Sequence, residues 1–290
     1  MNRFQMALTL SVALLFNVSD GYAESAGFDN LMPELIQVPT GMHEYRLSGE
    51  VLKNGHPVNA PMQNIYFPRI LHIMKYQVSS HNYALCVDDN LCSAPFRKQD
   101  RHKNFPVVGI SFIDAQNYAE WLSQKTGVTW RLPTDAEWSW SAGDRFFDDA
   151  FGVSDSMNEL SKRWIDDYRK SYTYTSKSDT VVNARGTYGA NENGLYDQSG
   201  NVWEWTDTCY QRYQLSLDDK LEMAGTPNCG VRILEGRHRS YMTNFIQDAI
   251  GGGCSAGTPP NFLGFRLVRD NPKFLSIKRF QNWMASVLRR

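Results

Sequence analysis

The segment from Asn193 to Trp205, N-G-L-Y-D-Q-S-G-N-V-W-E-W, constrains the fold most, because it combines turn signals, acidic residues and large aromatic residues in one short stretch. Its Asn-Gly and Gly-Asn dipeptides tolerate positive φ, so each predicts a tight turn. Trp203 and Trp205 alternate with Val202 and Glu204, which predicts a short extended strand with one aromatic face. A chain with many aromatic residues can hold long loops together with few regular elements.

The acidic residues of this segment allow two interpretations. Asp197 and Glu204 lie on either side of the turn at Gly200. Hard cations take oxygen ligands from carboxylates and from backbone carbonyls that turns leave free, so the spacing suits a metal site. The alternative is a tryptophan-rich core segment whose acids are solvated or paired with arginine. The spacing alone does not exclude either interpretation.

The first 23 residues have the layout of a secretory signal. Arg3 supplies a positive n-region, a mostly apolar stretch runs from Met6 to Val18, and Ala23 is a small residue at the expected cleavage point. That stretch is too short to predict a membrane span, and no later apolar run approaches one. We therefore expect residues 1–23 to be removed on export to a bacterial periplasm, with no transmembrane span in the remainder. An uncleaved N-terminal anchor is the alternative.

The charge balance argues against nucleic acid as a partner. The chain has 30 Lys and Arg residues and 31 Asp and Glu residues, for a net charge of -1, and the two signs are mixed along most of its length. Nucleic-acid-binding domains instead concentrate basic residues on one face. A hydrophobic content of 42% is enough for a packed core.

Five cysteines agree with an oxidising compartment. Cys86 and Cys92 are close enough in sequence to close a small loop. Cys209 and Cys229 flank a polar stretch that resembles an inserted loop, and we pair them next. Cys254 is then left over, and Cys229–Cys254 is the rival pairing.

Two capping boxes predict helices. Ser111 with Asp114 starts one helix, which Gly127 ends, and Thr134 with Glu137 starts a second, shorter helix.

Strands are expected in four places, and the last of them contains Gly264, where a glycine within a strand suggests that another backbone approaches closely. Residues 144–188 are charged and aromatic, and we expect long ordered loops there. Residues 271–290 form a basic tail whose apolar positions share one helical face, as in a helix that docks on its own domain, on a membrane surface or on a partner. The expected strand regions are 35–46 (two strands), 65–78 (a strand pair or one long strand), 231–234 and 263–268.

Three blocks of sequence follow one another in an order typical of one family. They are P-V-V-G-I-S-F from Pro106, R-L-P-T-D-A-E-W from Arg131, and N-G-L-Y-D with G-N-V-W-E-W in the segment above, closed by L-G-F-R from Leu263. In this order they resemble the sulfatase-modifying-factor domain of formylglycine-generating enzymes. The resemblance covers residues 28–270 as one domain. It implies an α+β, variant C-type-lectin-like fold with little regular secondary structure.

The resemblance also implies a structural calcium ion. In the family, the positions that match Asp197 and Glu204 supply side-chain oxygens, and those that match Gly200 and Val202 supply backbone carbonyls. The implied Ca²⁺ site agrees with the hard-cation interpretation of the segment.

The chain departs from the family at the active site. Formylglycine-generating enzymes carry a Gly-Gly-Ser block followed by two cysteines, whose thiolates bind copper(I). Here an ungapped match puts Ser240 and Phe245 at those positions, and neither can act as a thiolate. A standard formylglycine-generating oxidase is therefore not expected. Iron-binding, ergothioneine-type relatives use a separate histidine-bearing helical domain, for which this chain has no room.

The residues at that place suggest other chemistry. Arg237, His238 and Arg239 form a cationic cluster where the family holds its substrate, and Cys254 belongs to the loop before the last strand. We take Arg237, His238 and Cys254 as candidate catalytic residues, because arginine suits carboxylates or phosphates, histidine can be a base or a metal ligand, and cysteine can be a reactive thiol. The alternatives are a salt-bridge hub for acids such as Glu235, and a buried or disulfide-bonded cysteine.

Two hypotheses on function follow. The E-G-R-H-R block and the G-G-G-C-S-A-G-T-P-P loop resemble a periplasmic subgroup encoded beside copper nitrite reductases. The first hypothesis is therefore an accessory or maturation factor that acts on a protein or peptide, such as a nitrite reductase. The second is a metal- or oxygen-dependent oxidoreductase with a repurposed site, using copper or iron, similar to the pyoverdine-maturation oxidase.

Overall fold

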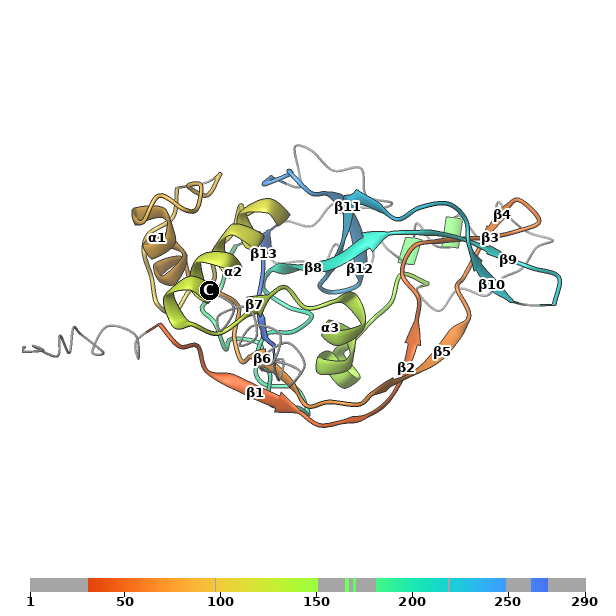
Figure 1. Ribbon diagram of the computed structural model, residues 1–290, viewed down its shortest axis with the longest axis horizontal. Coiled ribbons are helices and arrows are strands. Elements are labelled where there is room, and N and C mark those ends of the chain that lie inside the picture. The colour runs from red at the N-terminus through yellow and green to blue at the C-terminus, as the bar shows by residue number, and fades with distance from the viewer. Residues whose placement is uncertain are drawn as a thin grey trace, which may run out of the picture.

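The structure is a computed structural model that describes residues 31–96, 98–150, 165–166, 169–170, 181–218, 220–248 and 262–270. Within these residues the strands form three four-stranded sheets and one two-stranded ribbon (Figure 1). The strands are β1 (Leu35–Val38), β2 (Gly41–Arg46), β3 (Glu50–Lys53), β4 (His56–Val58), β5 (Met62–Phe67), β6 (Leu71–Met74), β7 (Trp130–Arg131), β8 (Trp203–Tyr210), β9 (Arg212–Leu215), β10 (Leu221–Met223), β11 (Asn228–Glu235), β12 (Arg239–Thr243), β13 (Leu263–Gly264) and β14 (Val268–Arg269). The helices are α1 (Ser80–Asp88), α2 (Phe112–Thr126), α3 (Asp135–Ala142) and the short 3₁₀ helix η2 (Gly143–Arg145).

The sheets are arranged along an elongated molecule (Figure 1). The sheet of order β12-β11-β8-β13 and the sheet of order β1-β6-β14-β7 make up the main body, and α2 contacts both through β8 and β7. Helix α3 contacts β8, β11 and β2, so it lies between the first sheet and the β2–β5 ribbon. The sheet of order β10-β9-β3-β4 forms the far end, opposite α1.

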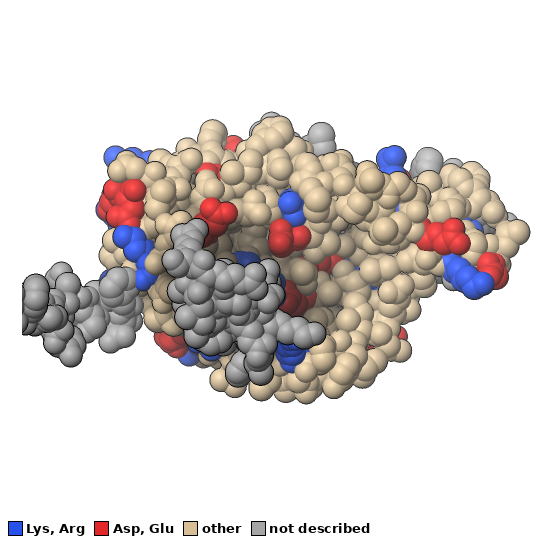
Figure 2. Space-filling model, in the orientation of Figure 1, with Lys and Arg blue, Asp and Glu red and all other residues tan. Residues whose placement is uncertain are grey.

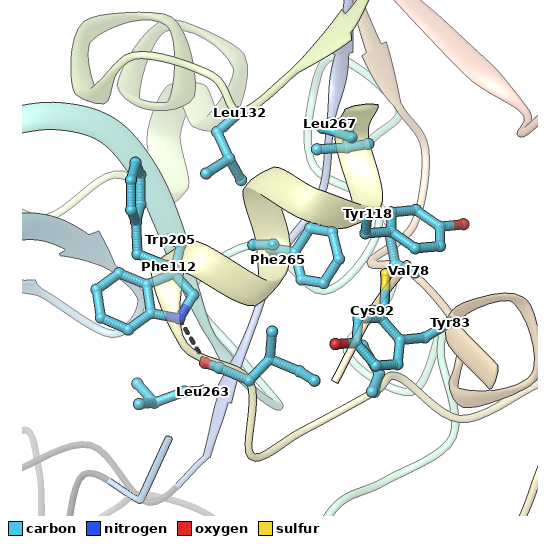
Figure 3. Packing of buried hydrophobic residues seen from close by; sticks show 14 of the residues in the cluster. Val78, Tyr83, Cys92, Phe112, Tyr118, Leu132, Trp205, Leu263, Phe265 and Leu267 are labelled. Carbon is cyan, nitrogen blue, oxygen red and sulfur yellow. Dashed lines mark hydrogen bonds between the residues drawn. The ribbon is translucent and has the colours of Figure 1, made fainter. Parts of the chain in front are cut away.

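The core collects around the tryptophans of the segment 193–205. Trp205 is fully buried, its indole N–H donates to the carbonyl of Ile110 at 2.7 Å, and its ring meets Phe112 edge-on (Figure 3). Tyr118 and Phe265 continue the same cluster. Aromatic burial of this kind stabilises a fold in which strands are short.

Both capping boxes are confirmed, because each is closed by reciprocal hydrogen bonds. Ser111 Oγ accepts from the Asp114 N–H at 3.1 Å, and the Asp114 carboxylate accepts from the Ser111 N–H at 3.0 Å. Thr134 and Glu137 make the same pair of contacts at the start of α3. Gly127 ends α2 with a φ of 67°, a conformation that favours glycine.

Both predicted disulfides, Cys86–Cys92 and Cys209–Cys229, are present, so the rival pairing of Cys229 with Cys254 is not formed. The close backbone approach expected at Gly264 is also confirmed, because a Cβ added there would lie 2.8 Å from the carbonyl oxygen of Val107.

Two strand predictions and one loop prediction differ in detail from the structure. Residues 263–268 split into β13, which pairs with β8, and β14, which pairs with β6 and β7, because the residues between them turn inward to fill the core. The polar stretch between Cys209 and Cys229 is not a plain loop, since β9 and β10 extend the β3–β4 sheet there. Residues 65–78 hold two strands that pair with different partners, β5 with β2 and β6 with β1.

Several predictions lie outside the described residues, namely the signal segment 1–23, most of 144–188, Cys254 and the tail 271–290. Among the helices of the described residues, none combines the length and the apolar character needed to cross a bilayer. On the face shown in Figure 2, acidic and basic side chains are interspersed without a broad basic area.

Candidate functional site

The tight turn between β11 and β12 holds the cationic residues that the sequence marks as site candidates. Glu235 and Arg239 close the hairpin as a cross-strand pair. Gly236 lies against the indole of Trp203, where a Cβ would come within 2.5 Å of the ring, so only glycine fits. The ring of His238 packs edge-on against the same indole, with centroids 4.7 Å apart. The hairpin is therefore anchored on the segment that organises the core.

His238 is a buried, neutral imidazole. Only 1% of its surface is exposed, and burial lowers its pKa, although the hydrogen bond to the Arg239 carbonyl opposes this. Nδ1 lies 2.7 Å from that carbonyl oxygen, which can only accept, so the proton sits on Nδ1. The other ring nitrogen, Nε2, then carries the lone pair and is the basic atom of the imidazole.

Arg239 is not available to a substrate, because acids surround it. Its guanidinium is fully buried. Nε donates to Glu235 at 3.0 Å, Nη2 lies 3.3 Å from Asp135, and Nη1 bonds Asp149 at 3.4 Å and the Arg46 carbonyl at 2.9 Å. We call Arg239 with these three acids the Arg239 cluster. The expected alternative, a salt-bridge hub that includes Glu235, is confirmed for this arginine.

The pKa values of two acids in the Arg239 cluster are shifted in opposite directions. Burial raises the pKa of Glu235 well above its ordinary value, and the neighbouring Asp135 carboxylate raises it further. Burial would also raise the pKa of Asp135, but Arg239 and hydrogen bonds from Glu235 and Tyr45 lower it below its ordinary value. One oxygen of each acid, Asp135 Oδ1 and Glu235 Oε2, otherwise has no partner. A neutral Glu235 that donates to an ionised Asp135 satisfies both oxygens.

The other positions singled out from the sequence differ in exposure. Arg237 is half-buried at the hairpin turn, and the hydroxyl of buried Ser240 has no hydrogen-bond partner among the described residues. Phe245 is 65% exposed. Cys254 cannot be placed relative to them, because it lies outside the described residues. The structure thus brings His238 against Trp203 and leaves the predicted Arg237–His238–Cys254 set open.

The sequence interpretation missed most of the Arg239 cluster. Asp135 was read only as the first residue of a capped helix, and Asp149 fell in the region without a clear pattern. Tyr45, which donates to Asp135, and Tyr241, which donates to Asp149, were not considered. No local pattern signals these contacts, since Tyr45 and Asp135 are 90 positions apart.

Glu204 is engaged by nitrogen donors on both oxygens. The Arg266 guanidinium donates to one oxygen from Nε at 2.6 Å and to the other from Nη2 at 2.7 Å. Trp138 Nε1 adds a bond of 2.8 Å, and Gln77 Nε2 adds one of 2.9 Å. Glu204 and Arg266 are both buried. Arg266 is the cation that the structure places beside this carboxylate.

N–H groups also donate to other predicted calcium ligands. The Asp197 carboxylate accepts from the backbone N–H groups of Gly186 and Tyr188. The Gly200 carbonyl accepts from the Val202 N–H at 2.8 Å. Among the described residues, no group of three or more His, Cys, Asp or Glu side chains is placed to hold a metal. N–H donors thus engage the carboxylates of Asp197 and Glu204 and the Gly200 carbonyl, an arrangement that favours the arginine-paired interpretation, and the calcium site stays a prediction.

A cavity of about 400 Å³ opens beside the start of β13. Phe262 lines it, and the carbonyl of Phe262 accepts from the Trp203 N–H at 2.8 Å, so the cavity adjoins the tryptophan that holds His238. Apolar side chains dominate the wall, which suits a side chain of a peptide. Its other lining residues include Lys98, His102, Phe105, Pro106, Val108 and Val182.

Comparisons with known proteins agree with this architecture. The family model of the sulfatase-modifying factor enzyme 1-like domain matches residues 23–271. The chain is 32% identical over 167 residues to the serine/threonine-protein kinase pkn1 of Chlamydia pneumoniae, covering 57% of this chain and 24% of the kinase. It is 28% identical over 175 residues to the formylglycine-generating enzyme of Streptomyces coelicolor, covering 58% of this chain and 53% of that enzyme. The chain thus spans about a quarter and about half of these relatives.

A solved structure shares the fold. PvdO from Pseudomonas aeruginosa matches with a TM-score of 0.51 and 18% identity, covering 83% of this chain and 95% of that chain. Together with the family match, this similarity confirms the predicted α+β fold of the formylglycine-generating-enzyme type.

Proposed function

The chain belongs to the sulfatase-modifying factor enzyme 1-like domain family, and from this premise we propose that it is a periplasmic accessory or maturation factor that binds a protein or peptide partner. In this proposal residues 1–23 are a cleaved signal, residues 28–270 are the binding domain, and residues 271–290 are a basic amphipathic helix. Nitrite reductase is the partner that we propose to test first, on the strength of the E-G-R-H-R block.

The state of the cysteines carries the proposal. The chain has five cysteines, and four of them are joined in two disulfides. At most one thiol, that of Cys254, is then left in each chain, whereas the family's copper(I) centre needs two thiolates. The domain keeps a packed core but lacks one of the two thiols that the copper(I) centre needs. Recognition is therefore the function that the geometry supports best.

Partner capture tests the proposal. We expect the tagged full chain, cross-linked in the periplasm of cells that express nitrite reductase, to recover one defined partner. Phe105→Asp should reduce the recovery at least tenfold, because it puts a charge into the apolar cavity beside Phe262. Leu217→Asp is the matched control, since Leu217 is exposed between β9 and β10 at the opposite end of the molecule.

The capture experiment can also contradict the proposal. Recovery of nothing above background from cells that express the neighbouring proteins would count against a binding role. Equal recovery by both variants would show that the cavity does not make the contact.

A second candidate function is a metal- or oxygen-dependent oxidoreductase. The observation that favours it is the tautomer of His238, because a proton on Nδ1 makes Nε2 the basic nitrogen of the ring beside Trp203. Its candidate residues are Arg237, His238 and Cys254, with copper or iron as the metal.

Metal analysis separates the two candidates. We expect the purified full chain, incubated with copper(I) or iron(II) and desalted, to retain neither metal in stoichiometric amounts, because one thiol and one imidazole make a poor site. Stoichiometric metal that is lost on both His238→Ala and Cys254→Ser would favour the oxidoreductase instead. His56→Ala is the control, since His56 is an exposed histidine on β4.

A further inference from the structure

A second cavity, of about 360 Å³, lies between the end of β6, the start of α1 and the middle of α2. It shares no residue with the β11–β12 hairpin, so the inference below is independent of the proposed function. The side of Tyr118 that carries the hydroxyl group points away from the core cluster (Figure 3), and Tyr118 lines this cavity. The polar residues used in the argument are Glu34, Gln77, Asn82, Asn104 and Arg185.

Arg185 is held in place in this cavity by neutral groups. Its Nη1 donates to the Gln77 carbonyl at 3.0 Å, and its Nη2 donates to the Lys103 carbonyl. The guanidinium also lies over the ring of Tyr76, 5.3 Å from the centroid. These contacts fix the orientation of the guanidinium but neutralise none of its charge.

The acids near Arg185 are engaged elsewhere. Asp197 and Glu34 favour its charge from a distance, but neither forms an ion pair with it in the part of the chain that the structure describes. The Asp197 carboxylate accepts from two backbone N–H groups. Glu34 pairs with Lys75 at 3.0 Å, which cancels its charge at the rim of the cavity. Arg185 is therefore a cation in the cavity wall with which no acid of the described residues forms an ion pair.

The guanidinium is costly to hold in this state. Burial lowers the pKa of Arg185. The Nε–H of Arg185 is buried and has no hydrogen-bond partner among the described residues, and the same holds for Gln77 Oε1. A partly desolvated cation without a counter-ion gains from any anion that reaches it. Within the described residues, no hydrogen bond engages the side-chain amides of Asn82 and Asn104, which line the same space.

We propose that this cavity binds a carboxylate group, with Arg185 as its counter-ion and the amides of Asn82 and Asn104 as hydrogen-bond partners. One positive charge matches a monoanion, and a planar carboxylate suits a guanidinium whose plane is fixed. A phosphate dianion would need a second cation, and Lys75 is already paired with Glu34. The volume admits a small organic acid or the terminal residue of a peptide.

Calorimetric titration of the full chain tests the site with three probes. These are propionate, the N-acetylated dipeptide acetyl-Gly-Ala with a free carboxylate, and the same dipeptide with a C-terminal amide. We expect saturable binding of a carboxylate probe and at least tenfold weaker binding of the amide. Preference for propionate or for the free dipeptide identifies the source of the carboxylate.

Two variants make the test independent of folding problems. Arg185→Met should weaken carboxylate binding at least tenfold, while Arg212→Met, at an exposed arginine on β9, should leave it unchanged. Asn104→Asp adds a negative charge at an exposed position, so it should also weaken binding while the fold is kept. Absence of saturable binding by the wild-type chain, or unchanged affinity in both cavity variants, would overturn the proposal.

Discussion

Replacing Glu204 with alanine is expected to lower the free energy of unfolding by about 3–5 kcal/mol, because it leaves a buried guanidinium without its carboxylate. The side chain of Arg266 is fully buried, and two of its nitrogens bond Glu204 at 2.6 and 2.7 Å. Its other hydrogen bonds go to the backbone carbonyls of Met74, Lys75 and Tyr196, which are neutral. Urea unfolding at pH 7 measures the loss.

Controls for this prediction separate the arginine from a bound cation. Glu34→Ala removes an exposed ion pair with Lys75 and should have a much smaller effect, since exposed pairs contribute little. The double variant Glu204→Leu with Arg266→Met should lose less than the sum of the two single losses, because it leaves no unpaired charge. The loss for Glu204→Ala should be the same with calcium and with EDTA. A loss that appears only in the presence of calcium would contradict the arginine-paired arrangement and restore the calcium site.

The features that could be predicted from the sequence are those whose partners lie close together along the chain. Ser111 and Asp114 are three positions apart, so the capping box and the start of α2 follow from local spacing. The loop of Cys86 and Cys92 spans six positions, and the disulfide forms as expected. Gly264 was informative for another reason, because a missing side chain within a strand is itself a sign of close packing.

The features that could not be predicted depend on partners far apart in the sequence. The segment 193–205 is compatible with calcium or with an arginine, and the arginine that pairs with Glu204, Arg266, lies 62 positions beyond it. The motif of block 131–138 marked Asp135 as a helix start, but its role in the Arg239 cluster depends on Tyr45 and on β11. Charge patterns along a chain do not show which acids fold onto the same arginine.

Neutralising both Asp135 and Glu235 is expected to lower the free energy of unfolding by about 3–5 kcal/mol, whereas neutralising either one should cost far less. The reason is that burial and the Asp135 carboxylate raise the pKa of Glu235, so we expect the two acids to share one proton and Arg239 to face one negative charge from the pair. In the Asp135→Asn variant, Glu235 can lose its proton and supply the negative charge that faces Arg239. In the Glu235→Gln variant, the side-chain amide can donate a hydrogen bond to Asp135 in place of the protonated carboxyl group. Only Asp135→Asn with Glu235→Gln leaves Arg239 without this charge.

The pH dependence of stability checks the same arrangement. The folded-state pKa of Glu235 is raised above its ordinary value of 4.5, so its contribution to stability is complete below pH 4.5 and is lost as the pH rises through the folded-state pKa. As the pH rises from 5 to 8.5, the free energy of unfolding of the Glu235→Gln variant should therefore increase relative to that of the wild-type chain. The increase should be up to about 1.4 kcal/mol for each pH unit, as long as the pH stays below the folded-state pKa of Glu235. The comparison at each pH cancels the titration of His43 and His238, whose lowered pKa values act in the opposite direction. A stability difference that does not change with pH, or two single variants each as unstable as the double variant, would show that Asp135 and Glu235 do not share a proton.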